Sequence, residues 1–344
     1  MPYPPDGSDL PEPSLPEDPF TGTSPRDGRE WSPPVFDGRW TPLPPKFRSR
    51  LWVHLLLFVV TLLTTMLAGA AHYQSYLSEF GRRSPEFDRF DWRLLARGLW
   101  YSGTLLAILG SHEMGHYLLC RRYNVDATLP YFIPAPLPIT GTLGAVIKIR
   151  EAFPNRRVLF DIGIAGPIAG FAVLVPALFL GLSMSPIIPE PTTGSGLSIG
   201  LPLMFQLAAT AVFGTIPAGY TFNMHPMAFA AWFGLLATAL NLLPFGQLDG
   251  GHISYATLRR WSTPLSIATV ASAMVMTYIS LSWLFMTVMM LAMLLVLGPR
   301  HPRVIDEYER LGAGRTILAV VALVILVLCF TPVPIEPYDL VRNP

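Results

Sequence analysis

The sequence predicts an all-α polytopic membrane protein with about seven transmembrane helices and a short β-hairpin that dips into the membrane. Of its 344 residues, 51% are hydrophobic and only 14% are charged, whereas a soluble domain has about 25% charged residues. The apolar residues form long runs separated by short charged stretches, which is the pattern of a chain that crosses a bilayer repeatedly. One stretch between these runs is too broken by proline to be helical, and it supplies the hairpin.

Spanning helices are expected wherever about 20 mostly apolar residues follow one another. The fifth and sixth of these segments are short and almost continuous, so we expect a tight helical hairpin there. Residues 201–214 are apolar but too short to span, and we expect them to lie along the interface or to dip into the bilayer. In chain order the seven segments are 51–71, 98–120, 158–183, 226–248, 263–281, 283–298 and 316–332.

The first 46 residues differ from the rest and are predicted to be a disordered, proline-rich tail. They combine proline with acidic residues and carry too little apolar surface to offset the entropy lost on folding. They lack the apolar core of a signal peptide, and their acidity is unlike that of an organelle transit peptide. We therefore expect residues 47–344 to form one multi-pass membrane domain.

Basic residues predict the orientation, because cytoplasmic loops of membrane proteins are enriched in Lys and Arg. With alternating passage the basic loops fall on one side, and residues 184–225 on the other side contain no Lys or Arg. The loop at 72–93 is mixed in charge. We expect the N-terminus inside, the C-terminus outside and, since no targeting peptide is evident, a bacterial cytoplasmic membrane. The residues that decide this are Lys46, Arg48, Arg50, Arg121, Arg122, Lys148, Arg150, Arg156, Arg157, Arg259, Arg260, Arg300, Arg303, Arg310 and Arg315.

The stretch AILGSHEMGHYLLC, residues 107–120, places three ionisable side chains at the end of an apolar helix. His112 and His116 are four residues apart, so they project from one helix face, about 6 Å apart along its axis. Two imidazoles at this spacing bind one zinc ion, and Glu113 beside them can take a proton from water. The pattern also occurs by chance, but ionisable residues at membrane depth are costly and are functional by default. A zinc site is therefore predicted here.

Two histidines are an incomplete site, because a catalytic zinc usually has three protein ligands and one open position. Asp249, at the end of the apolar segment in NLLPFGQLDGGH, is the clearest third ligand, and the two glycines after it are expected to let the backbone bend. Under the predicted topology Asp249 lies at the same depth as His112 and His116. His252 is a rival ligand, and an ordinary Asp-Gly-Gly turn is the alternative without a metal.

Three motifs together resemble the site-2 protease family of intramembrane zinc metalloproteases, in a compact form without a PDZ or CBS domain. They are HEMGH at 112–116, DIGIAGPIAG at 161–170 and N-x-x-P-x-x-x-L-D-G at 241–250. The resemblance extends from about residue 94 to residue 255, which would be the catalytic core. It implies hydrolysis of peptide bonds within the transmembrane segments of substrate proteins, in regulated intramembrane proteolysis.

The resemblance also implies a role for each residue of the site. His112, His116 and Asp249 would bind one Zn2+ per chain, and Glu113 would be the catalytic acid and base. Asn241 would hold the substrate or its oxyanion. The alternative for Asn241 is a hydrogen bond between helices of the bundle.

The residues between these groups are expected to shape the backbone. Pro244 should break the helix between Asn241 and Asp249, so that both can face the metal without a helical period. Gly166 and Gly170, in G-x-x-x-G spacing, are expected to serve close helix packing and not chemistry.

Residues 130–153 form the stretch that proline excludes from a helix, and GAVIKIR at 144–150 is predicted to be a strand. The peptide bonds of a substrate helix are shielded by their own hydrogen bonds, so the helix must be unwound before cleavage. An exposed strand edge can hold the extended segment by β-addition. We therefore predict a hairpin that dips toward the zinc and clamps the substrate, with an ordinary loop as the alternative.

The leading hypothesis is a membrane-embedded zinc endopeptidase whose partners are transmembrane substrates and the lipid bilayer. One alternative is a non-proteolytic metal-binding transporter or scaffold, against which the intact Glu113 weighs; another is a zincin in a soluble domain, for which this chain has too little polar sequence. The net charge of +1 argues against a general attraction to nucleic acid. His225 and His252 are expected to have plain polar roles, and the sequence does not define an oligomeric state.

Overall fold

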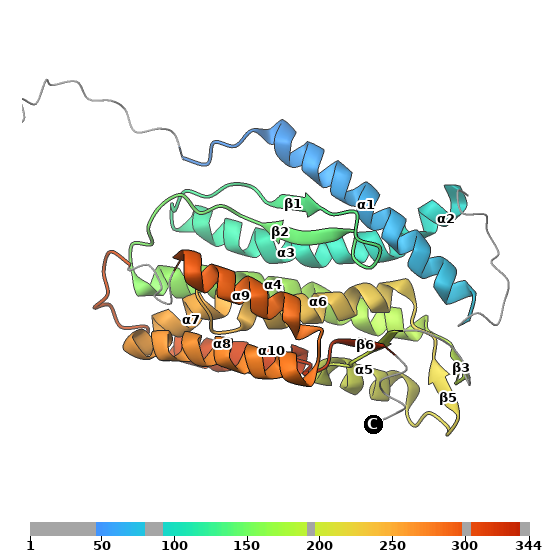
Figure 1. The fold of residues 1–344 in the computed structure, drawn as a ribbon. Coiled ribbons are helices and arrows are strands. Elements are labelled where there is room, and N and C mark those ends of the chain that lie inside the picture. Colours follow the sequence, from blue (N-terminus) through green and yellow to red (C-terminus); the bar gives the residue numbers. More distant parts are fainter. Residues whose placement is uncertain (1–45, 80–91, 191–196, 298–303, 338–344) are drawn as a thin grey trace, which may run out of the picture. The chain divides into compact units, whose positions relative to one another are not determined.

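The computed structural model describes residues 46–79, 92–190, 197–297 and 304–337 (Figure 1). Within them the chain is mostly helical, as predicted, while the predicted tail at 1–46 lies outside the described residues except for Lys46. The helices are α1 (Leu51–Leu77), α2 (Trp92–Arg97), α3 (Leu99–Arg122), α4 (Arg156–Ser183), α5 (Leu203–Phe213), α6 (Pro226–Leu242), α7 (Asp249–Leu258), the 3-10 turn η1 (Arg259–Trp261), α8 (Ser262–Ile279), α9 (Trp283–Leu297) and α10 (Ala313–Cys329). The strands are β1 (Tyr131–Pro134), β2 (Thr142–Val146), β3 (Ile187–Pro189), β4 (Leu197–Ile199), β5 (Tyr220–Phe222) and β6 (Ile335–Pro337).

A helix occupies each of the seven segments that the sequence marks as apolar. Among the described residues, three stretches are long and apolar enough to cross a membrane by themselves: α1, α4 and Asp249–Ile279, which η1 divides. α6, α9 and α10 are shorter apolar helices, so seven crossings remain a prediction. The expected helical hairpin is confirmed as α8 and α9, where the hydroxyl oxygens of Thr277 and Thr287 lie 2.8 Å apart.

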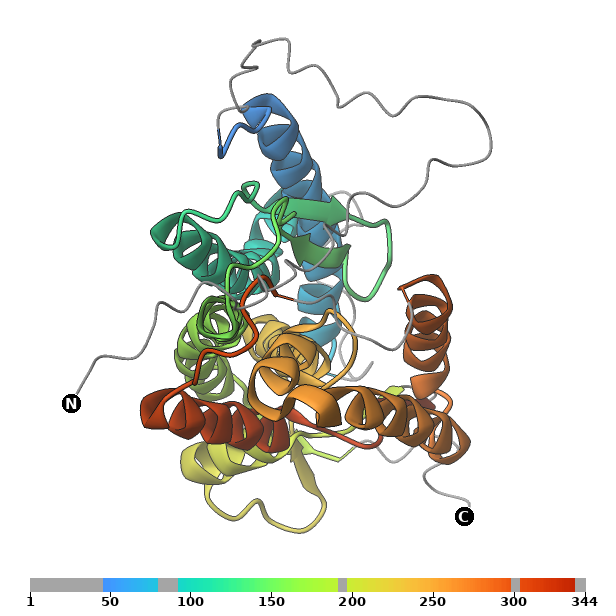
Figure 2. The same cartoon turned by 90° about the vertical axis from the view of Figure 1, so that its left-hand side faces the viewer.

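α4 and α6 lie in the middle of the bundle, with α1 and the β1–β2 hairpin on one side and α5 and α10 on the other (Figure 2). Small residues let these helices approach closely. A Cβ on Gly115 of α3 would lie 2.5 Å from the carbonyl oxygen of Ala165 in α4, and one on Gly181 of α4 would lie 2.3 Å from the backbone nitrogen of Ala228 in α6. Such contacts are a main source of helix association in membranes. Trp232 of α6 is fully buried in the same core.

The helix ends that carry basic residues meet in the structure. Tyr123 at the end of α3 and Arg315 at the start of α10 both donate hydrogen bonds to Asp161 near the start of α4. Arg156 at the start of α4 donates to the carbonyl oxygen of Ala256 near the end of α7. The ends that the Lys and Arg count assigned to one side of the membrane therefore lie together.

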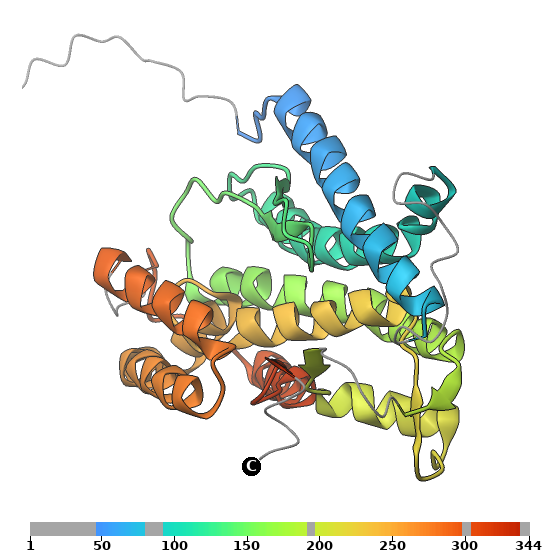
Figure 3. The same cartoon turned by 45° about the vertical axis from the view of Figure 1, so that its right-hand side comes forward.

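β1 and β2 form the predicted antiparallel hairpin, which runs along α1 and reaches α3 (Figures 1 and 3). The strand predicted at 144–150 is displaced, because β2 begins earlier and ends at Val146. Beyond it, an isolated bridge between Ala127 and Ile149 continues the pairing. The register shifts between Ile133 and Pro134, since proline has no N–H to extend the ladder.

Three side chains from α1 and α3 hold the turn of this hairpin. Thr64 donates its hydroxyl to the carbonyl oxygen of Gly141 at 2.7 Å, and Tyr101 donates to that of Ile139 at 3.2 Å. His72 Nε2 lies 2.7 Å from the same Ile139 oxygen. These bonds satisfy backbone oxygens that would be costly to bury without a partner.

The chain around Asp249 differs from the prediction. α6 ends at Leu242 instead of extending to 248, because Pro244 cannot continue a helix. Asp249 does not end a span but lies in the first turn of α7, and the glycines after it belong to that helix. A Cβ on Gly250 would lie 2.0 Å from the carbonyl oxygen of Leu242. Glycine is therefore required there for close backbone approach and not for a bend.

α5 accounts for most of the apolar residues 201–214. It packs beside α4 and α10 (Figure 3), which favours the alternative in which this segment dips into the bilayer. Near it the chain forms two short antiparallel pairs, β3 with β5 and β4 with β6.

Candidate metal centre

α3 carries three of the predicted site residues on its buried side. His112 and His116 are each 6% exposed and Glu113 is 8% exposed, although ionisable side chains are seldom buried without partners. The spacing of four residues places the two imidazoles on one helix face, as the sequence predicted, with their ring planes at 72° to each other.

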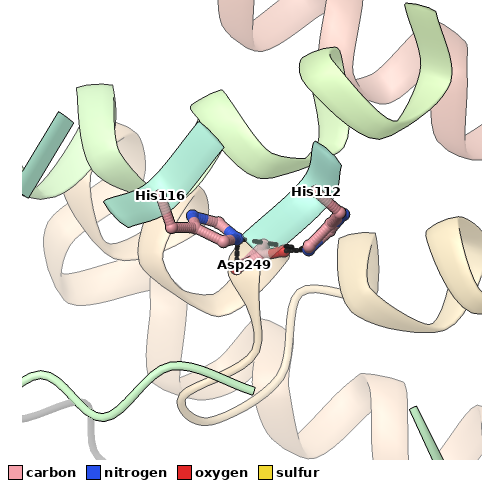
Figure 4. A group of neighbouring side chains, drawn as sticks. All are labelled: His112, His116 and Asp249. Atoms are coloured by element: carbon pink, nitrogen blue, oxygen red, sulfur yellow. Dashed lines mark hydrogen bonds and ion pairs between the residues drawn. The ribbon is translucent and has the colours of Figure 1, made fainter. Parts of the chain in front are cut away.

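Asp249 of α7 completes the group, and Figure 4 shows the three side chains pointing toward one another. Its Oδ2 lies 3.0 Å from His112 Nε2 and its Oδ1 lies 3.2 Å from His116 Nε2. The two Nε2 atoms are 3.1 Å apart. One ligand atom from each residue lies within 4.8 Å of the others, so two helices converge on one point.

The donor set fits a zinc ion. Two ligand atoms that are each about 2.1 Å from a tetrahedral zinc lie about 3.4 Å from each other, close to the separations found here. Asp249 Oδ2 is buried without a hydrogen-bond partner, although it lies 3.0 Å from His112 Nε2. Imidazole nitrogens and a carboxylate are ligands that zinc prefers. The lone pairs of the two Nε2 atoms and of the Asp249 carboxylate face one another, and a shared cation would make this arrangement favourable.

The carbonyl oxygen of Ile162 in α4 lies 2.7 Å from His116 Nδ1. With the proton on Nδ1, the ring donates to this oxygen and Nε2 presents a lone pair to the group. A second hydrogen bond of this kind fixes the tautomer and orientation of metal-binding histidines. Ile162 is therefore a supporting residue that the sequence reasoning did not identify, since a backbone carbonyl leaves no signal in side-chain spacing.

Gly166 and Gly170 of α4 lie against the two histidines. A Cβ on Gly166 would lie 2.0 Å from His116 Nε2, and one on Gly170 would lie 3.2 Å from His112 Cβ. The predicted close packing is thus present, and its partners are the candidate metal ligands. The cradle admits the imidazole rings only because these positions lack side chains.

Substitution of Gly166 by alanine is expected to weaken zinc binding by at least about tenfold, because the added methyl group must displace the His116 ring. The zinc dissociation constant, measured by chelator competition, checks this. Gly103→Ala in α3 is the matched control, since no atom lies within 4 Å of its added Cβ. Equal zinc affinity of Gly166→Ala and the wild type would contradict the cradle.

The other two predicted site residues also approach the group. Glu113 directly follows His112 on α3 and is buried with the two histidines. Asn241 Nδ2, at the end of α6, lies 3.5 Å from His112 Nε2. The structure thus brings all five predicted residues together, while their chemical roles stay predictions.

His225 and His252 have other contacts in the structure. His225 caps α6, with its Nδ1 accepting from the backbone N–H of Met227 at 3.2 Å. The His252 ring lies 5.7 Å from that of Phe153, and its Cβ faces Gly163. Among the described residues the metal-binding group contains Asp249 and not the rival His252.

Comparison with known proteins gives a consistent result. The profile of Peptidase family M50 matches residues 100–285. "Probable zinc metalloprotease EGY2, chloroplastic" of Oryza sativa subsp. indica is 30% identical over 294 residues, covering 82% of this chain and 50% of that protein. "Probable zinc metalloprotease EGY1, chloroplastic" of Arabidopsis thaliana is 32% identical over 229 residues, 59% of this chain and 40% of that protein.

A third relative, "Probable zinc metalloprotease EGY3, chloroplastic" of Oryza sativa subsp. indica, is 28% identical over 250 residues, 64% of this chain and 40% of that protein. The chain spans about half the length, or less, of these curated relatives. No solved structure matches the chain significantly.

Proposed function

The chain belongs to peptidase family M50, and from this membership we propose that it is a membrane zinc metalloendopeptidase that cleaves transmembrane segments of other proteins, in regulated intramembrane proteolysis. The observation that carries the proposal is the convergence of His112, His116 and Asp249, whose ligand atoms lie within 4.8 Å of one another. The relatives named zinc metalloproteases support both the metal and the reaction class.

The residues of the site divide the work. His112, His116 and Asp249 would hold the zinc, which would supply a Lewis acid for activating water and the scissile carbonyl. Glu113 takes the proton of the attacking water and delivers it to the leaving amine. Asn241, whose amide lies 3.5 Å from His112 Nε2, donates a hydrogen bond to the oxyanion.

The free edge of β2 binds the substrate as an added strand. β2 pairs with β1 on one edge, and no described strand pairs with the other. The Lys148 amide bonds to Thr128 inside the hairpin, so the neighbouring Ile147 amide faces the opposite way. β2 packs against α3, the helix that carries Glu113. An extended segment added to this edge would therefore lie beside the catalytic residues.

Replacement of Ile147 by proline is expected to abolish cleavage and to leave zinc content unchanged, because it removes one amide from the free edge and no metal ligand. Cleavage of a transmembrane substrate and bound zinc are measured on the same preparation. Lys148→Ala, which changes a neighbouring side chain and keeps every backbone amide, serves as the control.

The same proline also alters the backbone just after β2, which packs against the helix that carries Glu113, so substrate binding is compared in a Glu113→Gln background. Loss of binding there supports the strand edge. Normal cleavage by the proline variant would rule out the clamp.

The topology belongs to the same proposal. We propose that the chain crosses the membrane seven times. It consists of a tail at 1–46 and a membrane domain at 47–344, with the catalytic core at about 94–255. The basic helix ends support an inside N-terminus and an active site near the cytoplasmic side. A bacterial cytoplasmic membrane is our proposal, although the named relatives are chloroplastic plant proteins. Labelling of single cysteines at 184–225 and at 121–157 from each side tests the orientation.

The enzymatic activity is tested with a panel of single-span membrane proteins in detergent or vesicles. The wild type is expected to cut at least one of them within its transmembrane segment, a zinc chelator to stop the cleavage, and added zinc to restore it. Zinc binding without cleavage of any substrate would favour the non-proteolytic transporter or scaffold.

A further inference from the structure

Asp161 joins three helices near the metal centre. Arg315 of α10 donates to both carboxylate oxygens, from Nε to Oδ1 at 2.7 Å and from Nη2 to Oδ2 at 2.6 Å. Tyr123, the residue that ends α3, donates its hydroxyl to Oδ2 at 2.5 Å. The carboxylate is 14% exposed and the guanidinium 29%, so the pair is largely shielded from water. Two-pronged, charge-assisted bonds of this kind are strong and geometrically specific.

The residue after Asp161 contacts a candidate metal ligand. The carbonyl oxygen of Ile162 lies 2.7 Å from His116 Nδ1, and one turn further Gly166 lies against the same ring. α4 therefore sets both the tautomer and the orientation of His116. A shift of α4 along α3 would change the two contacts together.

The place of Arg315 in its own helix also needs an explanation. It lies in the first turn of α10, where the helix macrodipole disfavours a cation. Its side chain turns toward α4, and its Nη1 also donates to the carbonyl oxygen of Leu311 at 3.3 Å. The pairing with Asp161, and not the stability of α10, accounts for an arginine at this position.

We propose that Asp161 and Arg315 are positioning residues for the metal centre, an inference that rests on the zinc site of the proposed function. Arg315 and Tyr123 hold the Asp161 carboxylate, and Asp161 keeps α4 in register with α3. Ile162 then meets His116 Nδ1, so that His116 Nε2 faces the metal. α10 thereby contributes to metal affinity without touching the metal.

A second ion pair provides a matched control. Arg157 Nη1 lies 2.7 Å from Glu309 Oε1, so this pair links the same parts of the chain, the start of α4 and the segment before α10. Neither residue adjoins Ile162. Loss of the Arg157–Glu309 ion pair removes a similar link between these segments and leaves the contact between Ile162 and His116 in place.

The experiment measures the zinc dissociation constant by chelator competition and the visible absorption of the cobalt-substituted protein. Arg315→Met is expected to weaken zinc binding by about tenfold or more and to change the cobalt spectrum, as loss of an outer-shell partner does. Arg315→Lys keeps the charge without the two-pronged geometry and falls between Met and the wild type. Tyr123→Phe shifts both readouts in the same direction, whereas Glu309→Gln stays within about twofold of the wild type.

The inference would be overturned if the Arg315 and Tyr123 variants had wild-type zinc affinity and cobalt spectra and only a lower thermal stability. Asp161 and Arg315 would then stabilise the fold without positioning the metal centre. If Arg315→Met yields no folded protein, the zinc affinity and cobalt spectra of Arg315→Lys and Tyr123→Phe test the inference instead. If the wild type binds no zinc, the proposed function fails and this inference fails with it. If the wild type binds zinc and the variants bind it equally well, only this inference fails.

Discussion

Replacement of Glu113 by glutamine is expected to lower the rate of peptide hydrolysis by about 10²- to 10⁴-fold, the contribution typical of a general acid and base. The amide keeps the volume of the buried side chain but cannot accept the proton of the attacking water. Bound zinc should remain at the wild-type level, because the proposed metal ligands are His112, His116 and Asp249. Single-turnover cleavage of one substrate, with zinc content measured on the same sample, checks both parts.

Glu151→Gln is the control for Glu113→Gln. Glu151 is a carboxylate at the surface that pairs with Lys46 at 2.9 Å, far in sequence from the metal-binding group. This variant should cleave at the wild-type rate. Full activity of Glu113→Gln would remove Glu113 from the mechanism, and loss of its zinc would show that it acts on the metal and not on the proton.

Replacement of Asp249 by alanine should abolish both zinc binding and cleavage. The change removes one of the three proposed protein ligands, so the zinc dissociation constant is expected to rise by more than about 100-fold, beyond the effect of losing an outer-shell partner. It also leaves His112 and His116 facing each other, with Nε2 atoms 3.1 Å apart, without a counter-charge. Chelator competition measures the affinity, and a substrate assay with excess zinc measures the remaining activity.

Asp249→Asn separates the loss of the ligand from the loss of packing, because the amide preserves the volume but is a weaker ligand. Its zinc affinity should lie between those of Asp249→Ala and the wild type. Asp306→Ala removes an acidic side chain from an exposed segment and should leave both readouts unchanged. Wild-type zinc affinity in Asp249→Ala would exclude Asp249 as a ligand.

Several features of the site could be predicted because they depend on local spacing or on depth. His112 and His116 are one turn apart on a single helix, so a helical period is enough to place them together. Asp249 is 133 residues beyond His116 in the chain, but the alternation of apolar segments assigned both to the same membrane depth. Pro244 correctly marked a break after α6.

Other features depend on contacts that a single sequence does not encode. Asp249 begins a helix instead of ending one, because Gly250 allows α7 to fold back against the end of α6. The packing of Gly166 was predicted, but its partner, the ring of His116, emerges only from the helix arrangement. The pairing of Asp161 with Arg315 spans 154 positions. It joins α4 and α10, and the periodicity of apolar residues does not show that these two helices are neighbours.

The most direct test of the zinc site is X-ray absorption at the zinc edge of the purified wild type, combined with metal analysis. We expect about one zinc per chain, bound by nitrogen and oxygen at about 2.0–2.2 Å and by no sulfur. Two imidazoles should be visible in the outer scattering, and they should disappear when His112 and His116 are both replaced. Absence of zinc from metal-replete protein, or a sulfur ligand from Cys120 or Cys329, would contradict the site.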